Sequence, residues 1–248
     1  MKRCLAGLIF LLMNGFALAD TVPIAVASNF ALPMASLATA FSQQTGHRLQ
    51  VSTGASGKFY AQISNGAPFE VFLSADSEKP AQLEKDGLAV QGSRFTYAIG
   101  KLVLWSADPA VVDAKGQVLD KNQFNKLALA NPKTAPYGEA AMETLGALKL
   151  KSLLDPKMVM GENIGQTYQF VATGNAEIGF VALSQVTKDN KIISGSAWVV
   201  PEMLYSPIKQ DAVLLVKGKD SEAARQFLLF LKGAEATKVI RSHGYGVN

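Results

Sequence analysis

Residues 52–63, with the sequence STGASGKFYAQI, bring a serine, two glycines and a lysine close together. Three kinds of site use such residues: a loop that binds nucleotide phosphates, a serine nucleophile on a tight turn, and a helix start that binds an anion. Each kind requires different neighbours, so the residues around Ser56 and Lys58 decide between them.

The phosphate-loop interpretation fails at two positions. Such a loop requires a glycine separated by four residues from the Gly57-Lys58 pair, and a magnesium-binding hydroxyl directly after the lysine. Ser52 and Phe59 occupy these two positions. The sequence therefore does not favour a nucleotide site here.

The nucleophile interpretation has a similar defect. It requires the pattern Gly-x-Ser-x-Gly, and Lys58 stands where the second glycine is needed. A serine hydrolase also needs a base, and the two histidines, His47 and His243, lie in stretches that do not resemble a catalytic loop. An exported serine hydrolase that uses Ser56 is therefore kept only as a less favoured alternative.

An anion site requires less: a hydroxyl at a helix start, small residues that let a ligand approach, and free backbone amides. Ser56 and its neighbours meet these requirements, and three other predicted strand-to-helix junctions repeat them: Ser28-Asn29, Pro136-Tyr137-Gly138 and Asn163-Ile164-Gly165. Ligands of open α/β sheets bind beyond the carboxyl ends of the strands, so four such junctions can face one cleft. Taken singly, Ser28, Asn29 and Ser56 are best interpreted as ordinary helix caps.

The elements that must position these junctions follow from short β-rich runs that alternate with helical patterns. This alternation predicts an α/β protein with two sheets, dominated by parallel strands and flanked by helices. The predicted strands cover residues 22–27, 49–53, 69–73, 102–105, 127–130, 178–181 and 212–216. The predicted helices cover residues 32–46, 58–64, 77–87, 139–148, 166–173, 221–232 and 235–242.

The order of these elements predicts two lobes with a ligand cleft between them. No low-complexity linker separates the halves, so paired crossings fit better than two independent domains. We expect residues 20–98 and 204–248 to form the first lobe and residues 99–203 to form an inserted second lobe. The hinge is expected near residues 97–101 and 201–207.

Residues 1–19 have the features of a cleavable signal peptide. Lys2 and Arg3 precede an apolar run, which ends in the small-residue triplet Ala17-Leu18-Ala19. Cleavage removes the single cysteine, Cys4, and lowers the formal charge of the chain from +4 to +2. The mature protein is therefore expected to be exported and soluble, without disulfides, and its weak charge argues against nucleic acid as a partner.

Several stretches of the chain carry a resemblance to a known family. They are VASNFALPMASLATAFSQQTG, VSTGASGKFYAQISNGAPFEVFLSAD, NPKTAPYGEAAMETL, GENIGQTYQFVATGNAEIGFVALSQV, YSPIKQDAVLL and FLKGAEATKVIRSHGYGV. Together they cover nearly all of the mature chain, and they resemble the periplasmic molybdate-binding proteins of ABC importers. The resemblance implies a bilobal periplasmic-binding-protein fold of type II and a periplasmic monomer. It further implies molybdate or tungstate as the ligand, no cofactor and no catalysis, and delivery to a membrane permease with its ATPase.

The resemblance also implies which residues contact the oxygens of the anion, none of them touching the metal directly. From the first lobe these groups are the Ser28 hydroxyl, the amide of Ser28 or Asn29, and the hydroxyl and amide of Ser56. From the second lobe they are the backbone amides of Tyr137 and Ile164. One branch of the family uses a tyrosine hydroxyl at the position of Ala182. Because alanine offers no hydroxyl, Asn29 is expected to supply the missing contact.

Neutral donors suit a fully deprotonated dianion, which accepts hydrogen bonds on every oxygen and donates none. Molybdate, tungstate and sulfate share this property, whereas phosphate still carries a proton at neutral pH and can use an acidic acceptor. Sulfate, thiosulfate and phosphate therefore stay open as alternative ligands. Lys58, the nearest cation to the predicted site, is expected to point to solvent.

Overall fold

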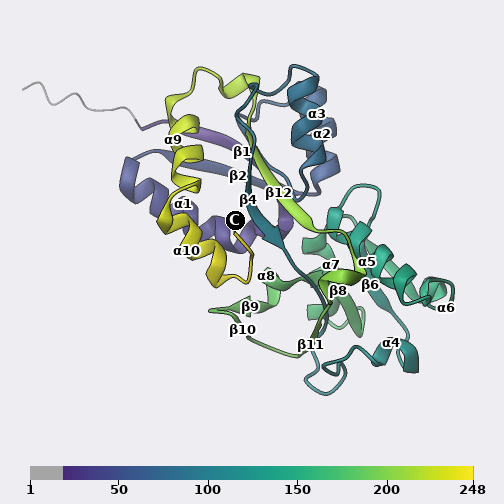
Figure 1. Cartoon of the computed structure of the whole chain (residues 1–248). Coiled ribbons are helices and arrows are strands. Elements are labelled where there is room, and N and C mark those ends of the chain that lie inside the picture. Colours follow the sequence, from purple (N-terminus) through teal and green to yellow (C-terminus); the bar gives the residue numbers. More distant parts are fainter. Residues whose placement is uncertain (1–18, 248) are drawn as a thin grey trace, which may run out of the picture.

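The computed structural model describes residues 19–247, so residues 1–18 of the predicted signal peptide lie outside the described part. Figure 1 shows two α/β lobes. The purple and yellow segments, from the two ends of the chain, share one lobe, and the teal and green segments form the other. No helix within residues 19–247 is long and apolar enough to cross a membrane.

The first lobe contains a five-stranded sheet in the order β2-β1-β3-β12-β4. Strand β1 pairs in parallel with both of its neighbours, and β12 pairs antiparallel with both of its own. The strands are β1 (Thr21–Ala27), β2 (Arg48–Gly54), β3 (Val71–Leu73), β4 (Phe95–Gly100) and β12 (Ile208–Leu214). The helices are α1 (Ala31–Thr45), α2 (Ser56–Ser64), α3 (Glu78–Lys85), α9 (Glu222–Leu231) and α10 (Ala234–Ser242).

Both faces of this sheet are covered, because apolar side chains alternate along β1. Ile24 and Val26 pack in one core cluster with side chains of α1, α9 and α10. Ala25 points to the opposite face and packs in a second cluster with side chains of α2 and α3. A strand that is buried on both faces is expected to be apolar throughout, as β1 is after its exposed first residue, Thr21.

The second lobe repeats this plan with the order β11-β5-β8-β6-β7, in which β5 runs against both of its neighbours. Its strands are β5 (Leu102–Ser106), β6 (Leu127–Ala130), β7 (Met158–Gly161), β8 (Ile178–Ala182) and β11 (Ser196–Val199). Its helices are α4 (Val118–Lys121), α5 (Pro136–Ala147), α6 (Lys151–Leu154), α7 (Ile164–Ala172) and α8 (Leu183–Val186). The remaining elements are the hairpin β9 (Thr187–Lys188) and β10 (Lys191–Ile192), and the 3-10 turns η1 (Ser28–Phe30), η2 (Asp155–Lys157), η3 (Glu202–Leu204) and η4 (Val216–Gly218).

All seven predicted strands and all seven predicted helices are present, with bounds that differ by a few residues. Strand β12 covers Ile208–Leu214, so the prediction of residues 212–216 missed its first half. Sequence reasoning also missed β4, β7, β11 and the small hairpin. Each sheet is mixed, because β12 and β5 run against the other strands of their sheets.

The chain crosses between the two sheets twice. The outward crossing is Lys101, between the end of β4 and the start of β5. The return crossing covers residues 200–207 and includes η3, between β11 and β12. The strands β4 and β12 that flank these crossings are neighbours in the first sheet, so the two crossings lie side by side.

Candidate functional site

A small cavity lies between the lobes, where β1, β2, β6 and β7 end and the chain turns into helices. Its volume is about 10 Å³. The lining residues are Ala27, Ser28, Asn29, Gly54, Ala55, Ser56, Ala75, Ala135, Pro136, Tyr137, Asn163 and Ile164. The structure therefore brings all five predicted site residues to one cavity, from both lobes.

Three helices begin at this cavity. The first residues of α2 and α7 are Ser56 and Ile164, and Tyr137 follows Pro136 at the start of α5. The first N–H groups of a helix have no acceptor within the helix, and proline has no N–H, so Tyr137 carries the first donor of α5. Each helix start also carries a partial positive charge. The converging helices therefore offer backbone donors and a positive potential at one point.

Ser56 is buried, and its side chain has a defined direction. Its Oγ accepts a hydrogen bond from the N–H of Ala75 at 2.9 Å. Because this contact uses only a lone pair, the hydroxyl proton stays available for a ligand oxygen. The prediction that Ser56 is a helix cap is wrong: Ala55 holds the N-cap position, and Ser56 is the first helical residue.

Ser28 bridges the two lobes. Its Oγ donates to Oδ1 of Asn163 at 3.1 Å and accepts from the N–H of Gly165 at 3.2 Å. The interpretation of Ser28 as the cap of the helix that follows it is also wrong, because Ser28 begins the turn η1 and its side chain caps neither η1 nor α1; it contacts the first turn of α7 instead. Since its one proton is directed to Asn163, the group that Ser28 offers to the cavity in this arrangement is its backbone N–H.

Asn29 is buried, and its side-chain N–H groups are directed to polar residues behind the cavity. Its Nδ2 donates to Oε1 of Gln210 at 2.8 Å and to Oη of Tyr245 at 2.9 Å. Both N–H hydrogens of the side chain are therefore used, and Oδ1 has no hydrogen-bond partner among residues 19–247. Asn29 does not act as a side-chain cap either, and its remaining donor near the cavity is the backbone N–H.

Tyr137 and Ile164, from the second lobe, are also buried. The phenol of Tyr137 accepts a hydrogen bond from Nε2 of Gln210 at 3.1 Å, and burial raises its pKa well above the usual range. The carbonyl of Ile164 accepts from Nε2 of Gln185 at 3.0 Å. These contacts fix the start of each helix, and the tyrosine hydroxyl stays neutral near pH 7.

Two further contacts join the lobes beside the cavity. The N–H of Gly57 donates to the carbonyl oxygen of Thr134 at 2.9 Å. Lys58 forms an ion pair with Glu162, and both side chains are about half exposed. The expectation that Lys58 simply points to solvent is therefore corrected, because its ammonium group spans the cleft to the other lobe.

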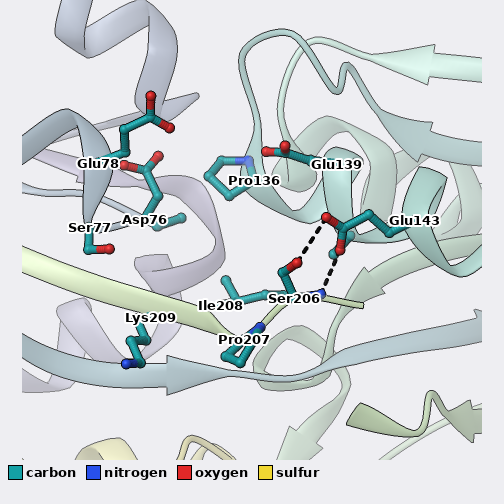
Figure 2. A pocket seen from close by; sticks show the side chains of 12 residues that line it. Asp76, Ser77, Glu78, Pro136, Glu139, Glu143, Ser206, Pro207, Ile208 and Lys209 are labelled. Atoms are coloured by element: carbon teal, nitrogen blue, oxygen red, sulfur yellow. Dashed lines mark hydrogen bonds between the residues drawn. The ribbon is translucent and has the colours of Figure 1, made fainter. Parts of the chain in front are cut away.

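A larger pocket of about 210 Å³ lies next to the small cavity and shares Ala75 and Pro136 with it. Figure 2 shows the carboxylates that line it: Asp76, Glu78, Glu139 and Glu143, with Lys209 as a cation. Glu143 accepts hydrogen bonds from the backbone N–H and the hydroxyl of Ser206. An excess of carboxylates repels a dianion, so the small cavity is the better anion site although the pocket is larger.

Sequence reasoning missed the polar residues behind the cavity. Gln210 lies before the predicted start of its strand, and Tyr245 lies beyond the last predicted helix. No local sequence signal identifies either residue, because their contacts reach Asn29 over separations of 181 and 216 residues. Ala182 is buried at the end of β8 and does not line the cavity.

Comparisons with known proteins agree with this architecture. Residues 22–246 match the family described as bacterial extracellular solute-binding protein. The molybdate-binding protein of Azotobacter vinelandii is 58% identical over 231 residues, which cover 93% of this chain and 92% of the relative. The molybdate-binding protein of Rhodobacter capsulatus is 52% identical over 237 residues, which cover 94% of this chain and 92% of the relative.

A solved structure is similar over the same length. The periplasmic molybdate-binding protein of Azotobacter vinelandii superposes with a TM-score of 0.89 and 43% sequence identity. The match covers 92% of this chain and 99% of that chain. Fold and sequence similarity therefore extend over both lobes, and the family match spans the part of the chain that forms the small cavity.

Proposed function

The chain belongs to the family of bacterial extracellular solute-binding proteins, and on that basis we propose that it captures molybdate, and also tungstate, in the small cavity. One observation carries the proposal: the starts of α2, α5 and α7 converge with the buried hydroxyl of Ser56 on one cavity between the lobes. The names of the two relatives that are more than half identical support molybdate as the ligand.

The chemistry of the lining fits a dianion with four acceptor oxygens. We assign the contacts to the Ser56 hydroxyl and to backbone N–H groups of Ser28, Asn29, Ser56, Tyr137 and Ile164. All are neutral donors, and no carboxylate is among the residues that line the cavity. An oxyanion that carries a proton would find no carboxylate acceptor there, which disfavours hydrogen phosphate. Molybdate and tungstate differ little in size and are expected to bind alike.

Capture is proposed to proceed by closure of two lobes, made of residues 20–98 with 204–248 and of residues 99–203. The hinge is assigned near residues 97–101 and 201–207. The side-by-side crossings at Lys101 and residues 200–207 support this assignment, because they are the two connections between the sheets. Closure would form the contacts between Gly57 and Thr134 and between Lys58 and Glu162, and it would exclude water from the anion.

The loaded protein is proposed to act as an exported periplasmic monomer that delivers the anion to a membrane permease driven by an ATPase. Family membership and the identity of the relatives support this role. The protein needs no cofactor for it, and we expect no catalysis. Sulfate, thiosulfate and phosphate are the alternative ligands within the same class of binding protein.

The hydrolase alternative is disfavoured by the positions of the histidines. Neither His47 nor His243 lines the cavity that contains Ser56. Nδ1 of His47 accepts a hydrogen bond from the N–H of Asp20 at 3.1 Å, near the start of β1. Ser56 therefore has no imidazole base within reach, and the proposed role of its hydroxyl is to bind and not to react.

Crystals grown with tungstate test the location of the site, because tungsten scatters X-rays anomalously. We expect one strong anomalous peak between the starts of α2, α5 and α7. A strong peak in the acidic pocket of Figure 2, with none in the small cavity, would contradict the assignment.

A further inference from the structure

Gln210 is fully buried one layer behind the small cavity, which it does not line. Its Oε1 accepts hydrogen bonds from Nδ2 of Asn29 at 2.8 Å and from Oη of Tyr97 at 3.0 Å. Its Nε2 donates to Oη of Tyr137 at 3.1 Å. A single side-chain amide thus binds one cavity residue from each lobe.

Two features of the backbone, a register shift in β12 and a glycine in β4, make room for the side-chain amide of Gln210. The pairing of β12 with β4 shifts register between Gln210 and Asp211, and such irregularities redirect side chains next to functional sites. Gly100, at the end of β4, leaves the necessary space. A Cβ atom on Gly100 would lie 2.6 Å from Nε2 of Gln210 and 2.2 Å from Oη of Tyr137. Any side chain larger than hydrogen at this position would therefore displace the contact.

The polar groups around Gln210 form one connected set. Tyr245 accepts from Asn29 and hydrogen-bonds to the hydroxyl of Ser184 at 2.9 Å, and Ser184 donates to the carbonyl of Asn29 at 2.9 Å. These contacts connect η1 with α8 of the second lobe, as Gln210 connects η1 with α5. Apart from Oδ1 of Asn29, the side-chain polar atoms of this set are paired among residues 19–247, and buried networks of this kind hold their members in one arrangement.

The two residues that Gln210 holds carry backbone donors of the proposed anion site. Asn29 lies in η1 and Tyr137 at the start of α5, so their separation sets how far apart donors from the two lobes stand. Binding sites discriminate between ligands of equal charge by donor positions, and these must be held to about 0.5 Å.

We propose that Gln210 is a positioning residue, which sets the separation of the η1 and α5 donors and thereby the size of the oxyanion that the site prefers. Gln210 touches no anion itself. The inference rests on the proposed capture of molybdate and adds to it the residue that supports selection of molybdate over the smaller sulfate.

The test compares the full mature protein with Gln210→Met, which nearly conserves volume and removes the three hydrogen bonds. Calorimetric titration with molybdate and, separately, with sulfate gives both affinities. For Gln210→Met we expect molybdate affinity to fall by about 10-fold to 100-fold, the range for leaving buried polar partners unpaired. We also expect the ratio of molybdate to sulfate affinity to fall by about 5-fold or more, since a misplaced donor penalises the preferred anion most.

A second variant isolates the contact between the lobes. Tyr137→Phe removes the hydroxyl that Gln210 holds. The double variant, with both Tyr137→Phe and Gln210→Met, should bind molybdate within about 3-fold of Gln210→Met alone. This is expected because the two side chains act through one contact. Leu231→Ala, at the end of α9 and buried in the core, is the matched control. It should lower the melting temperature and leave both anion affinities unchanged.

If Gln210→Met does not fold, Gln210→Glu answers the same question through its pH profile. The carboxyl group donates to Tyr137 only while it is protonated, and its ionised form accepts from Tyr137 instead. Because the ionised form repels molybdate and sulfate alike, the measurement is the ratio of the two affinities, which should fall as pH rises from about 6 to 8. The outcomes distinguish the proposed function from the positioning role of Gln210. Wild-type protein that does not bind molybdate refutes the proposed function. Wild-type protein that binds, with an unchanged affinity ratio in Gln210→Met or a flat pH profile in Gln210→Glu, overturns the role of Gln210 alone.

Discussion

The backbone N–H of Gly57 donates to the backbone carbonyl of Thr134 at 2.9 Å, from the first turn of α2 to the loop that precedes α5. This bond joins the lobes directly beside the small cavity, without any side chain. A Cβ atom on Gly57 would lie 2.9 Å from Cα of Thr134 and 3.1 Å from its carbonyl oxygen. The close approach of the two lobes therefore requires glycine at position 57.

The first prediction follows from this approach. Gly57→Ala should weaken molybdate binding by about 10-fold or more, because the methyl group prevents full closure. The unliganded protein should be at least as stable as the wild type, since alanine in a helix is favoured over glycine by about 0.5–1 kcal/mol. Calorimetry and thermal unfolding measure the two effects. Gly146→Ala in α5, where a Cβ meets nothing within 4 Å, is the control and should leave binding unchanged.

Ser56→Ala should lower molybdate affinity by about 10-fold to 100-fold, because hydrogen bonds to a charged group contribute about 1.5–3 kcal/mol. The substitution also leaves the N–H of Ala75 without its acceptor. Ser64→Ala, exposed at the end of α2, is the matched control. The wild-type serine should resist a serine-reactive phosphonate. Stoichiometric labelling of Ser56 would instead support the hydrolase alternative.

The ion pair between Lys58 and Glu162 should contribute little to binding, since both side chains are about half exposed. Glu162→Gln is expected to weaken molybdate binding by less than about 5-fold at low salt. At about 1 M salt, where charges are screened beyond about 3 Å, the difference from wild type should disappear. Titrations at two ionic strengths measure it, with Glu235→Gln on α10 as the control. A large loss that persists in high salt would show that the pair is more than a surface contact.

Molybdate affinity should be constant between about pH 7 and 9, because the proposed donors are neutral amides and a hydroxyl. The three buried tyrosines behind the site lead to a separate prediction, on the pH dependence of stability. Burial raises the pKa of Tyr97, Tyr137 and Tyr245, so they stay protonated in the folded protein. Their unfolded pKa is about 10, so their contribution to stability is complete below that pH and is lost as pH rises above it. Unfolding measured between pH 7 and 11 should show a decline only above about pH 10.

The sequence predicted the parts of the fold that depend on local patterns. The apolar run of β1 and the junction after it, for example, are visible in a few consecutive residues. Strand β4 was missed because its sequence, FTYAIG, lies where the chain crosses between lobes and was interpreted only as a hinge. The missed strands β7 and β11 are short edge strands that are only partly buried, whereas β6, also of four residues, is buried and apolar throughout.

Which residues form the candidate site could likewise be predicted from local sequence, whereas the directions of their side chains could not. Its five residues could be predicted because they lie at junctions between a strand and a helix or helical turn, and family resemblance singled out these junctions. The directions of their side chains could not be predicted. The hydroxyl of Ser28 turns to Asn163 and the amide of Asn29 to Gln210, and these partners are 135 and 181 residues away in the chain. Only the folded arrangement shows that the Ser56 oxygen accepts a hydrogen bond from the N–H of Ala75, a contact that does not use the hydroxyl proton.

Calorimetric titration of the purified mature protein with molybdate, tungstate, sulfate and phosphate tests the central claim most directly. We predict one site per chain, with similar and tight binding of molybdate and tungstate, weaker binding of sulfate, and the weakest binding of phosphate. No heat with molybdate, alongside clear binding of sulfate, thiosulfate or phosphate, would contradict the proposed function.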